Sequence, residues 1–159
     1  MKQTVKTSKW VSLFSVVLLL SGALSACSKN PDFDQELVKA AKKGDMQSVT
    51  HALENGADVS ARDPKFHATA LMWASHWEHL DIMRILMQHG ATVDAKGGEG
   101  ETALWFTAQQ GRLQAMKLLV ENGADPTVVG RDGQSAYAVA AAENHPEITA
   151  YLQSLGITE

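Results

Sequence analysis

The chain has 159 residues, with 14 Lys and Arg against 18 Asp and Glu, and so a formal net charge of −4 at neutral pH. Its 45% apolar content is enough to bury a core, and its length allows one domain or at most two. The acidic balance argues against a nucleic-acid-binding protein, which needs a basic surface for phosphates. One cysteine excludes an internal disulfide and any multi-cysteine zinc or iron–sulfur site.

The N-terminal segment has the order of a secretion signal. Lys2, Lys6 and Lys9 give it a positive start without an acidic residue. An apolar run then extends from Trp10 to Leu20, and small residues close the segment. This order is typical of a signal peptide, and the apolar run is shorter than the roughly 20 residues that a membrane span needs.

The segment ends in Leu24-Ser25-Ala26-Cys27, which resembles the lipobox of bacterial lipoproteins. The resemblance implies cleavage before Cys27 and lipid chains on this residue. We therefore expect a lipoprotein signal peptide at 1–26 and a lipidated tether at 27–33. Ser28 stands where an aspartate would suggest retention at the inner membrane, so we expect anchoring at the outer membrane, facing the periplasm. The alternative is an ordinary signal peptide with an unrelated cysteine.

The rest of the chain repeats a unit of about 33 residues. Gly-Ala-Asp or Gly-Ala-Thr recurs at intervals of 34 and 33 residues, and the Thr-Ala-Leu triplets of the two inner units stand 21 residues before their glycines. These landmarks are Gly56-Ala57-Asp58, Gly90-Ala91-Thr92, Gly123-Ala124-Asp125, a truncated Gly156, Thr69-Ala70-Leu71 and Thr102-Ala103-Leu104.

Together these landmarks resemble the ankyrin repeat from about Asp34 to Gly156. The resemblance implies an all-α solenoid over residues 34–159, built from helix–turn–helix units joined by hairpin loops. The four units should cover about 34–66, 67–99, 100–132 and 133–159. Local signals agree, because Thr69 and Thr102 can cap first helices and apolar residues spaced by three or four mark the second helices. Glu78 departs from the pattern, since units one and three carry glycine at its position.

The sequence contains no motif of catalysis. A nucleophile elbow, a phosphate-binding loop and an HExxH motif are all missing from it, so we expect neither an enzyme nor a cofactor. His76 and His79, with His67 nearby, suggest a metal hypothesis, but zinc needs three or four convergent ligands, and we expect no metal site. The resemblance instead implies that His79 and His145 are structural histidines bonded to their own backbone.

Aromatic residues of the inner units point to a binding face. In ankyrin-repeat proteins, hairpin tips and the exposed side of the first helices form a concave surface that binds other proteins. By position, the partner-binding residues here would be Phe66, Trp73, His76, Trp77, Glu99, Glu101, Gln109, Gln110, Arg131 and Asp132. Phe66 and Trp77 should be exposed, whereas Trp73, Trp105 and Phe106 could equally belong to the core.

Charge suggests two further features of this face. An acidic rim of Glu99, Glu101 and Asp132 would steer a basic partner. Lys39, Lys42 and Lys43 would form either a solvated cap helix or a contact with anionic lipid.

These features predict a membrane-tethered module that binds another protein and no nucleic acid, and that is monomeric when unbound. Two roles fit this description. The first is an immunity or inhibitor protein that neutralises a toxic effector enzyme such as a phospholipase. The second is an accessory scaffold for a resident periplasmic enzyme, for example in catalase-type oxidative defence.

Overall fold

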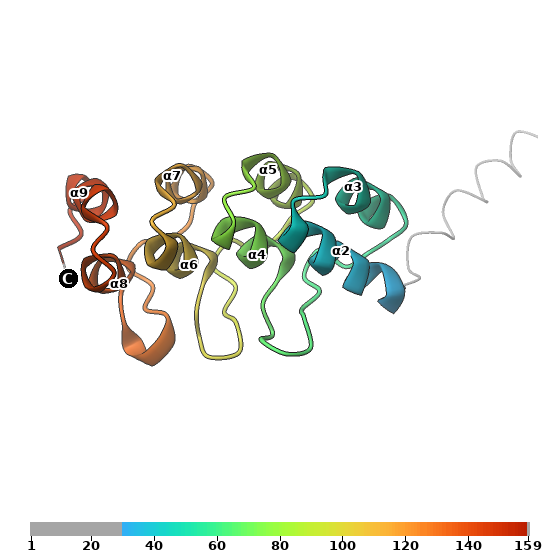
Figure 1. The fold of residues 1–159 in the computed structure, drawn as a ribbon, viewed down its shortest axis with the longest axis horizontal. Helices are drawn as coiled ribbons and strands as arrows, with labels where there is room; N and C mark the ends of the chain where they lie inside the picture. Colours follow the sequence, from blue (N-terminus) through green and yellow to red (C-terminus); the bar gives the residue numbers. More distant parts are fainter. Residues whose placement is uncertain (1–29, 159) are drawn as a thin grey trace, which may run out of the picture.

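The computed structural model describes residues 30–158, which form one row of stacked helix pairs (Figure 1). Their helices are α2 (Pro31–Lys43), α3 (Met46–Glu54), α4 (Ala70–His76), α5 (Leu80–Gln88), α6 (Ala103–Gln110), α7 (Leu113–Glu121), α8 (Ala136–Ala142) and α9 (Pro146–Ser154), with a short 3-10 turn, η1 (Arg131–Gly133), before α8. Within this range the backbone forms no strand, only an isolated antiparallel bridge between Arg62 and Thr69. The predicted all-α solenoid of helix pairs is therefore confirmed.

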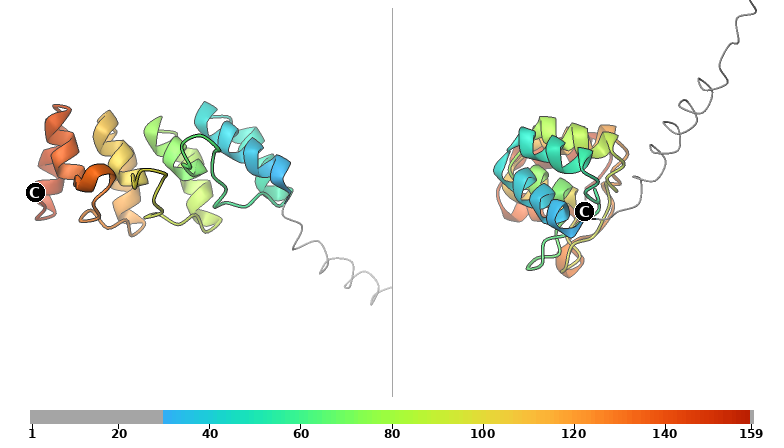
Figure 2. Two further views of the ribbon diagram at one scale, coloured as in Figure 1. Left: turned by 90° about the horizontal axis from the view of Figure 1, so that it is seen from below. Right: turned by 90° about the vertical axis from the view of Figure 1, so that its right-hand side faces the viewer.

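The helices form two rows, and the hairpin loops project from one side of them (Figures 1 and 2). The inner row consists of α2, α4, α6 and α8, which pack on one another in that order, and each carries one helix of the outer row. The loops before α4, α6 and α8 extend beyond the inner row on the same side. Inner helices and hairpins thus share one face of the molecule.

The first helix starts earlier than the repeat pattern indicated. Asn30 is its N-cap, with the side chain accepting a hydrogen bond from the Asp32 N–H at 3.2 Å, and Pro31 occupies the first helical position. Residues 31–33, expected to be part of the tether, are therefore helical. Cys27 and the 1–26 segment lie outside the described residues. No helix of 30–158 is long and apolar enough to cross a membrane.

Hydroxyl residues begin the first helices of the later units. The side-chain oxygens of Thr69, Thr102 and Ser135 accept hydrogen bonds from the backbone N–H three residues later, at 3.3, 3.2 and 3.1 Å. Each bond satisfies one N–H group that the helix itself leaves unpaired. The capping role predicted for the two threonines is confirmed.

The position between the two helices of a unit has a left-handed backbone in all four units. Its φ angle is 77° at Gly44, 59° at Glu78, 67° at Gly111 and 59° at Asn144. A side chain costs about 1 kcal/mol in this conformation, and asparagine tolerates it best. Glu78 is therefore strained, as its departure from the repeat pattern suggested.

Gly44 and Gly111 also make room for a histidine of the following unit. A Cβ atom on Gly44 would lie 2.7 Å from the ring of His79, and one on Gly111 would lie 2.6 Å from the ring of His145. The Nε2 atom of His145 lies 3.1 Å from the carbonyl oxygen of Gln109. This histidine therefore bonds the preceding unit and not its own backbone, which corrects the expectation for it.

Candidate functional site

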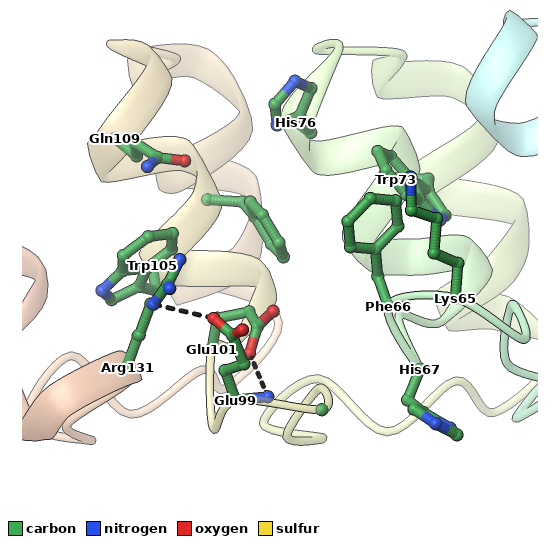
Figure 3. A pocket seen from close by; sticks show the side chains of 12 residues that line it. Lys65, Phe66, His67, Trp73, His76, Glu99, Glu101, Trp105, Gln109 and Arg131 are labelled. Atoms are coloured by element: carbon green, nitrogen blue, oxygen red, sulfur yellow. Dashed lines mark hydrogen bonds and ion pairs between the residues drawn. The ribbon is translucent and has the colours of Figure 1, made fainter.

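A hollow of about 410 Å³ opens on the face shared by the hairpins and the inner helices (Figure 3). We call it the groove. The hairpin before α4, the hairpin before α6 and the turn η1 supply one wall, and α4 and α6 supply the other. Its lining residues are Lys65, Phe66, His67, Trp73, His76, Gly98, Glu99, Glu101, Trp105, Phe106, Gln109 and Arg131.

Most of the predicted partner-binding residues meet at this groove. The residues that line it are Phe66, Trp73, His76, Glu99, Glu101, Gln109 and Arg131. Trp77, Gln110 and Asp132 are not part of its lining, although Trp77 contacts His76 with ring centroids 4.9 Å apart. The set chosen by sequence position therefore largely forms one surface, and the role of that surface in binding stays a prediction.

A continuous series of edge-on ring contacts crosses the groove. Ring centroids are 5.8 Å apart for Phe66 and Trp73, 5.9 Å for Trp73 and His76, 5.6 Å for His76 and Phe106, and 5.5 Å for Phe106 and Trp105. This geometry brings the positive edge of one ring to the negative face of the next. We call these five residues the aromatic strip.

The aromatic residues of the strip and the neighbouring Trp77 differ in burial, and their exposed fractions decide which of them belong to the core and which to the surface. Trp105 is only 5% exposed and belongs to the core as well as to the groove wall. Trp73 and Phe106 are partly buried. Phe66 and Trp77 are 44% and 47% exposed, so their predicted exposure is confirmed. Large exposed aromatic side chains are typical of sites where another protein binds.

Asp63, which sequence reasoning did not select, fixes the N-terminal end of the strip. Its carboxylate accepts hydrogen bonds from the Trp73 indole N–H at 2.7 Å and from the backbone N–H of Lys65 at 2.9 Å. The backbone N–H of Phe66 donates to it as well. The aspartate therefore joins the hairpin to α4 and places Phe66 against Trp73. An aspartate followed by proline is a turn signal, and only its contact with Trp73 requires the fold.

The three carboxylates of the acidic rim expected at the other end of the groove make contacts within the protein. Glu99 pairs with Arg131 at 2.8 Å (Figure 3). Arg131 also lies 3.7 Å from Asp132. Glu101 is only 7% exposed, and its carboxylate accepts a hydrogen bond from the Glu99 N–H at 2.8 Å. Glu101 was expected on the exposed rim, but it instead holds the hairpin turn together.

Two lysines at the N-terminal end of the groove contact rings, whereas Arg131 pairs with carboxylates. The Nζ atom of Lys42 lies 3.9 Å from the Trp73 ring centroid, and that of Lys65 lies 4.9 Å from the Phe66 centroid. Burial lowers the pKa of His76, and the positive charges of Arg112 and Lys42 lower it further. His76 is therefore neutral at neutral pH, in a positive local field.

The histidines do not assemble a metal centre in the part of the chain that the structure describes. Residues 30–158 contain no group of three or more His, Cys, Asp and Glu side chains placed to hold a metal ion. His67 and His76 line the groove, whereas His79 packs against Gly44 in the neighbouring turn.

Comparison with known proteins identifies the repeat. A family profile described as "Ankyrin repeats (3 copies)" matches residues 37–129 and again 93–158. The chain is similar to the Palmitoyltransferase Hip14 of Drosophila melanogaster (40% identical over 70 residues, 43% of this chain and 11% of that protein). It is also similar to the 2-5A-dependent ribonuclease of Mus musculus (36% over 69 residues, 43% and 9%) and to the Palmitoyltransferase AKR1 of Eremothecium gossypii (37% over 87 residues, 52% and 12%). The chain thus spans only about a tenth of the length of these relatives.

Proposed function

Because the chain belongs to the ankyrin-repeat family, whose repeats are protein-binding modules, we propose that it binds another protein through the groove. The observation that carries this proposal is the aromatic strip, in which Phe66 is half-exposed, together with the half-exposed Trp77 beside His76. Aromatic residues dominate the binding energy of protein interfaces. The exposed area of Phe66 and Trp77 would be covered by the partner.

We further propose that the bound protein is an enzyme toxic to the envelope, such as a phospholipase, and that this chain is its immunity protein. What supports the setting is the signal-like segment 1–26 and the lipobox-like sequence that ends at Cys27. Acyl chains on Cys27 would anchor the protein, since each buried methylene contributes about 0.8 kcal/mol. A tethered inhibitor would be concentrated on the surface that such an enzyme attacks.

The binding face is tested in the full chain by changing Phe66, which lines the groove, and Trp77, which lies beside it. Phe66→Ala with Trp77→Ala should weaken partner capture at least tenfold, since loss of an interface hot spot costs about 2 kcal/mol. Leu155→Ala is the control, because Leu155 is similarly exposed, at 42%, but lies at the end of the outer helix α9. Capture equal to that of the control would place the binding face elsewhere.

The inhibitory role is tested with the captured protein itself. Co-expression of this chain should restore growth to cells that export the enzyme, and the purified complex should show reduced turnover. A captured enzyme that keeps full turnover would favour the scaffold role instead.

Membrane anchoring is tested separately from binding. Cells that express the full chain should incorporate a labelled palmitate analogue into it, and Cys27→Ala should abolish the label. Fractionation should place the labelled protein in the outer membrane. A Cys27→Ala chain with unchanged label and unchanged membrane fraction would rule out the lipobox interpretation.

A further inference from the structure

The ammonium groups beside Phe66 and Trp73 have no ion-pair partner within residues 30–158, although the whole chain is acidic. Among the described residues, Lys42 and Lys65 form no ion pair with any carboxylate, and their ammonium groups rest on the rings of Trp73 and Phe66. At the opposite end, Glu99 is already paired with Arg131. Glu99 and Asp132 share this one guanidinium, so the free cations that a partner meets lie at the Lys42 and Lys65 end of the face.

A second hollow, of about 310 Å³, lies on the other side of the same rings. Lys65, Phe66 and Trp73 line both hollows, so these three residues form a ridge between them. Lys39 and Lys42 line the second hollow from α2. Three ammonium groups thus surround an exposed aromatic ridge.

The acidic side chains nearest to this ridge already accept hydrogen bonds within the protein. The Asp63 carboxylate lies in the second hollow but accepts hydrogen bonds from Trp73 and from the hairpin backbone. Glu36 pairs with His51 on the outer helix α3. Lys39 also borders a separate hollow that contains Asp32 and Glu36, so the ammonium groups of Lys42 and Lys65 carry most of the free charge.

We infer that the groove accepts an acidic segment of the partner protein, in which carboxylates flank a bulky apolar side chain. This inference rests on the proposed function and specifies the partner's chemistry. The apolar side chain would fill the larger hollow against the aromatic strip. The carboxylates would meet Lys42 and Lys65, each of which would then lie between a ring face and an anion. Opposite charges across an interface of this kind raise association rates and select the partner.

The shape of the face favours a protein segment over a lipid surface. The ridge lies between two hollows, and the hairpins that carry Lys65 and Glu99 project beyond the inner helices (Figure 1). A flat membrane surface would contact the hairpin tips and would leave the hollows empty. A side chain that protrudes from a polypeptide can enter them.

Peptide selection on the immobilised full chain, purified in detergent, tests the inference. A library of random twelve-residue peptides should yield sequences with net negative charge in which an aromatic or leucine residue neighbours Asp or Glu. Lys42→Glu with Lys65→Glu should weaken binding of a selected acidic peptide about tenfold at low salt, and added salt should reduce the difference.

A matched control separates local charge from total charge. Arg84→Glu with Lys117→Glu makes the same change in net charge, but on the outer helices α5 and α7. Lys117 also matches the groove lysines in that its Nζ atom lies over a ring, 5.6 Å from the centroid of Tyr151. This variant should bind the acidic peptide like the unchanged chain. Vesicles of phosphatidylcholine with about a third phosphatidylglycerol should bind the unchanged chain and the Lys42→Glu, Lys65→Glu variant equally, because that binding would depend on the lipid anchor alone.

The outcomes are distinct. Failure to enrich acidic peptides, or equal peptide binding by the two doubly changed chains, overturns the inference. Vesicle binding that is lost with Lys42→Glu and Lys65→Glu assigns the lysines to lipid and also overturns it. Selected basic peptides whose binding depends on Phe66 and Trp77 would refute the acidic partner but keep the groove as a binding face, so the proposed function would survive. Peptides that bind independently of Phe66 and Trp77 would contradict both.

Discussion

Replacing Gly111 by alanine should destabilise the protein for two separable reasons. The backbone at Gly111 is left-handed, with φ 67° and ψ 31°, where a Cβ atom costs about 1 kcal/mol. The new Cβ atom would also lie 2.6 Å from Nδ1 of His145, so the ring must move. Moving it breaks the 3.1 Å contact between Nε2 and the Gln109 carbonyl, which is worth about 1 kcal/mol.

The expected total cost of Gly111→Ala is about 2–3 kcal/mol in the free energy of unfolding, once some loss of ring packing is included. In a chain that already carries His145→Ala, no ring stands in the way. The cost of Gly111→Ala should then fall to about 1 kcal/mol, the strain alone. Glu78→Gly should act in the opposite direction and stabilise by about 0.5 kcal/mol, because it relieves the same strain at φ 59°.

Urea unfolding followed by the helical circular dichroism signal measures the free energy of unfolding of the unchanged chain, Gly111→Ala, His145→Ala, the double variant and Glu78→Gly. The slope against urea must stay constant across the variants, because only then do the midpoints compare stability. A Gly111→Ala cost that is equal with and without His145 would refute the role assigned to the histidine ring. A Glu78→Gly variant less stable than the unchanged chain would refute the strain at Glu78.

Three further predictions concern the cap, the histidine and the surface ion pair. Thr102→Ala should cost about 1 kcal/mol and Thr102→Ser much less, because serine keeps the oxygen that accepts the Trp105 N–H; thermal melting of both variants checks this. The pKa of His76 is lowered in the folded state, so protonation of this residue favours unfolding. The free energy of unfolding should therefore fall as the pH drops below about 6.5. Urea midpoints measured across this pH range should fall less steeply in His76→Phe. Arg131→Gln should cost less than about 1 kcal/mol, because its pair with Glu99 is exposed, and a larger change in melting would mean that the pair holds the hairpin.

The fold could be predicted because the same local sequence signals recur in successive repeats. Thr69 and Thr102 each mark the start of a first helix, and the glycines that follow the second helices recur at a fixed distance. Each signal acts within a few residues of its own position, so sequence alone reveals it. The early start of α2 at Pro31 was missed because the first unit has no counterpart before it with which to align.

The charges of the groove could not be predicted because they depend on contacts between units. Glu99 and Arg131 lie in successive hairpins, and only the stacking of the repeats brings them to 2.8 Å. Glu101 is buried by the turn that it holds. The expectation of a basic partner rested on the list of carboxylates alone, in which these contacts do not appear, and it stays a prediction.

Contacts between units also explain why Glu78 departs from the repeat pattern. In the units that begin their second helix with a histidine, His79 and His145, the preceding unit carries a glycine against which the ring packs. The unit after Glu78 has Arg112 at the equivalent helix cap. Arg112 has no ring, so the histidine packing found at Gly44 and Gly111 has no counterpart at Glu78. The relevant pattern is a pair of positions in neighbouring repeats, which inspection of single repeats does not reveal.

The hydrogen bonds of Asp63 have a consequence for how a partner is recognised. They hold the Trp73 indole and the hairpin that carries Phe66 in one arrangement before any partner arrives. Binding to such a preorganised surface loses little conformational entropy, so a small contact area can support tight association. The free and the partner-bound structures of this region should then superimpose closely. A protein whose shape is not complementary to this fixed surface should bind only weakly.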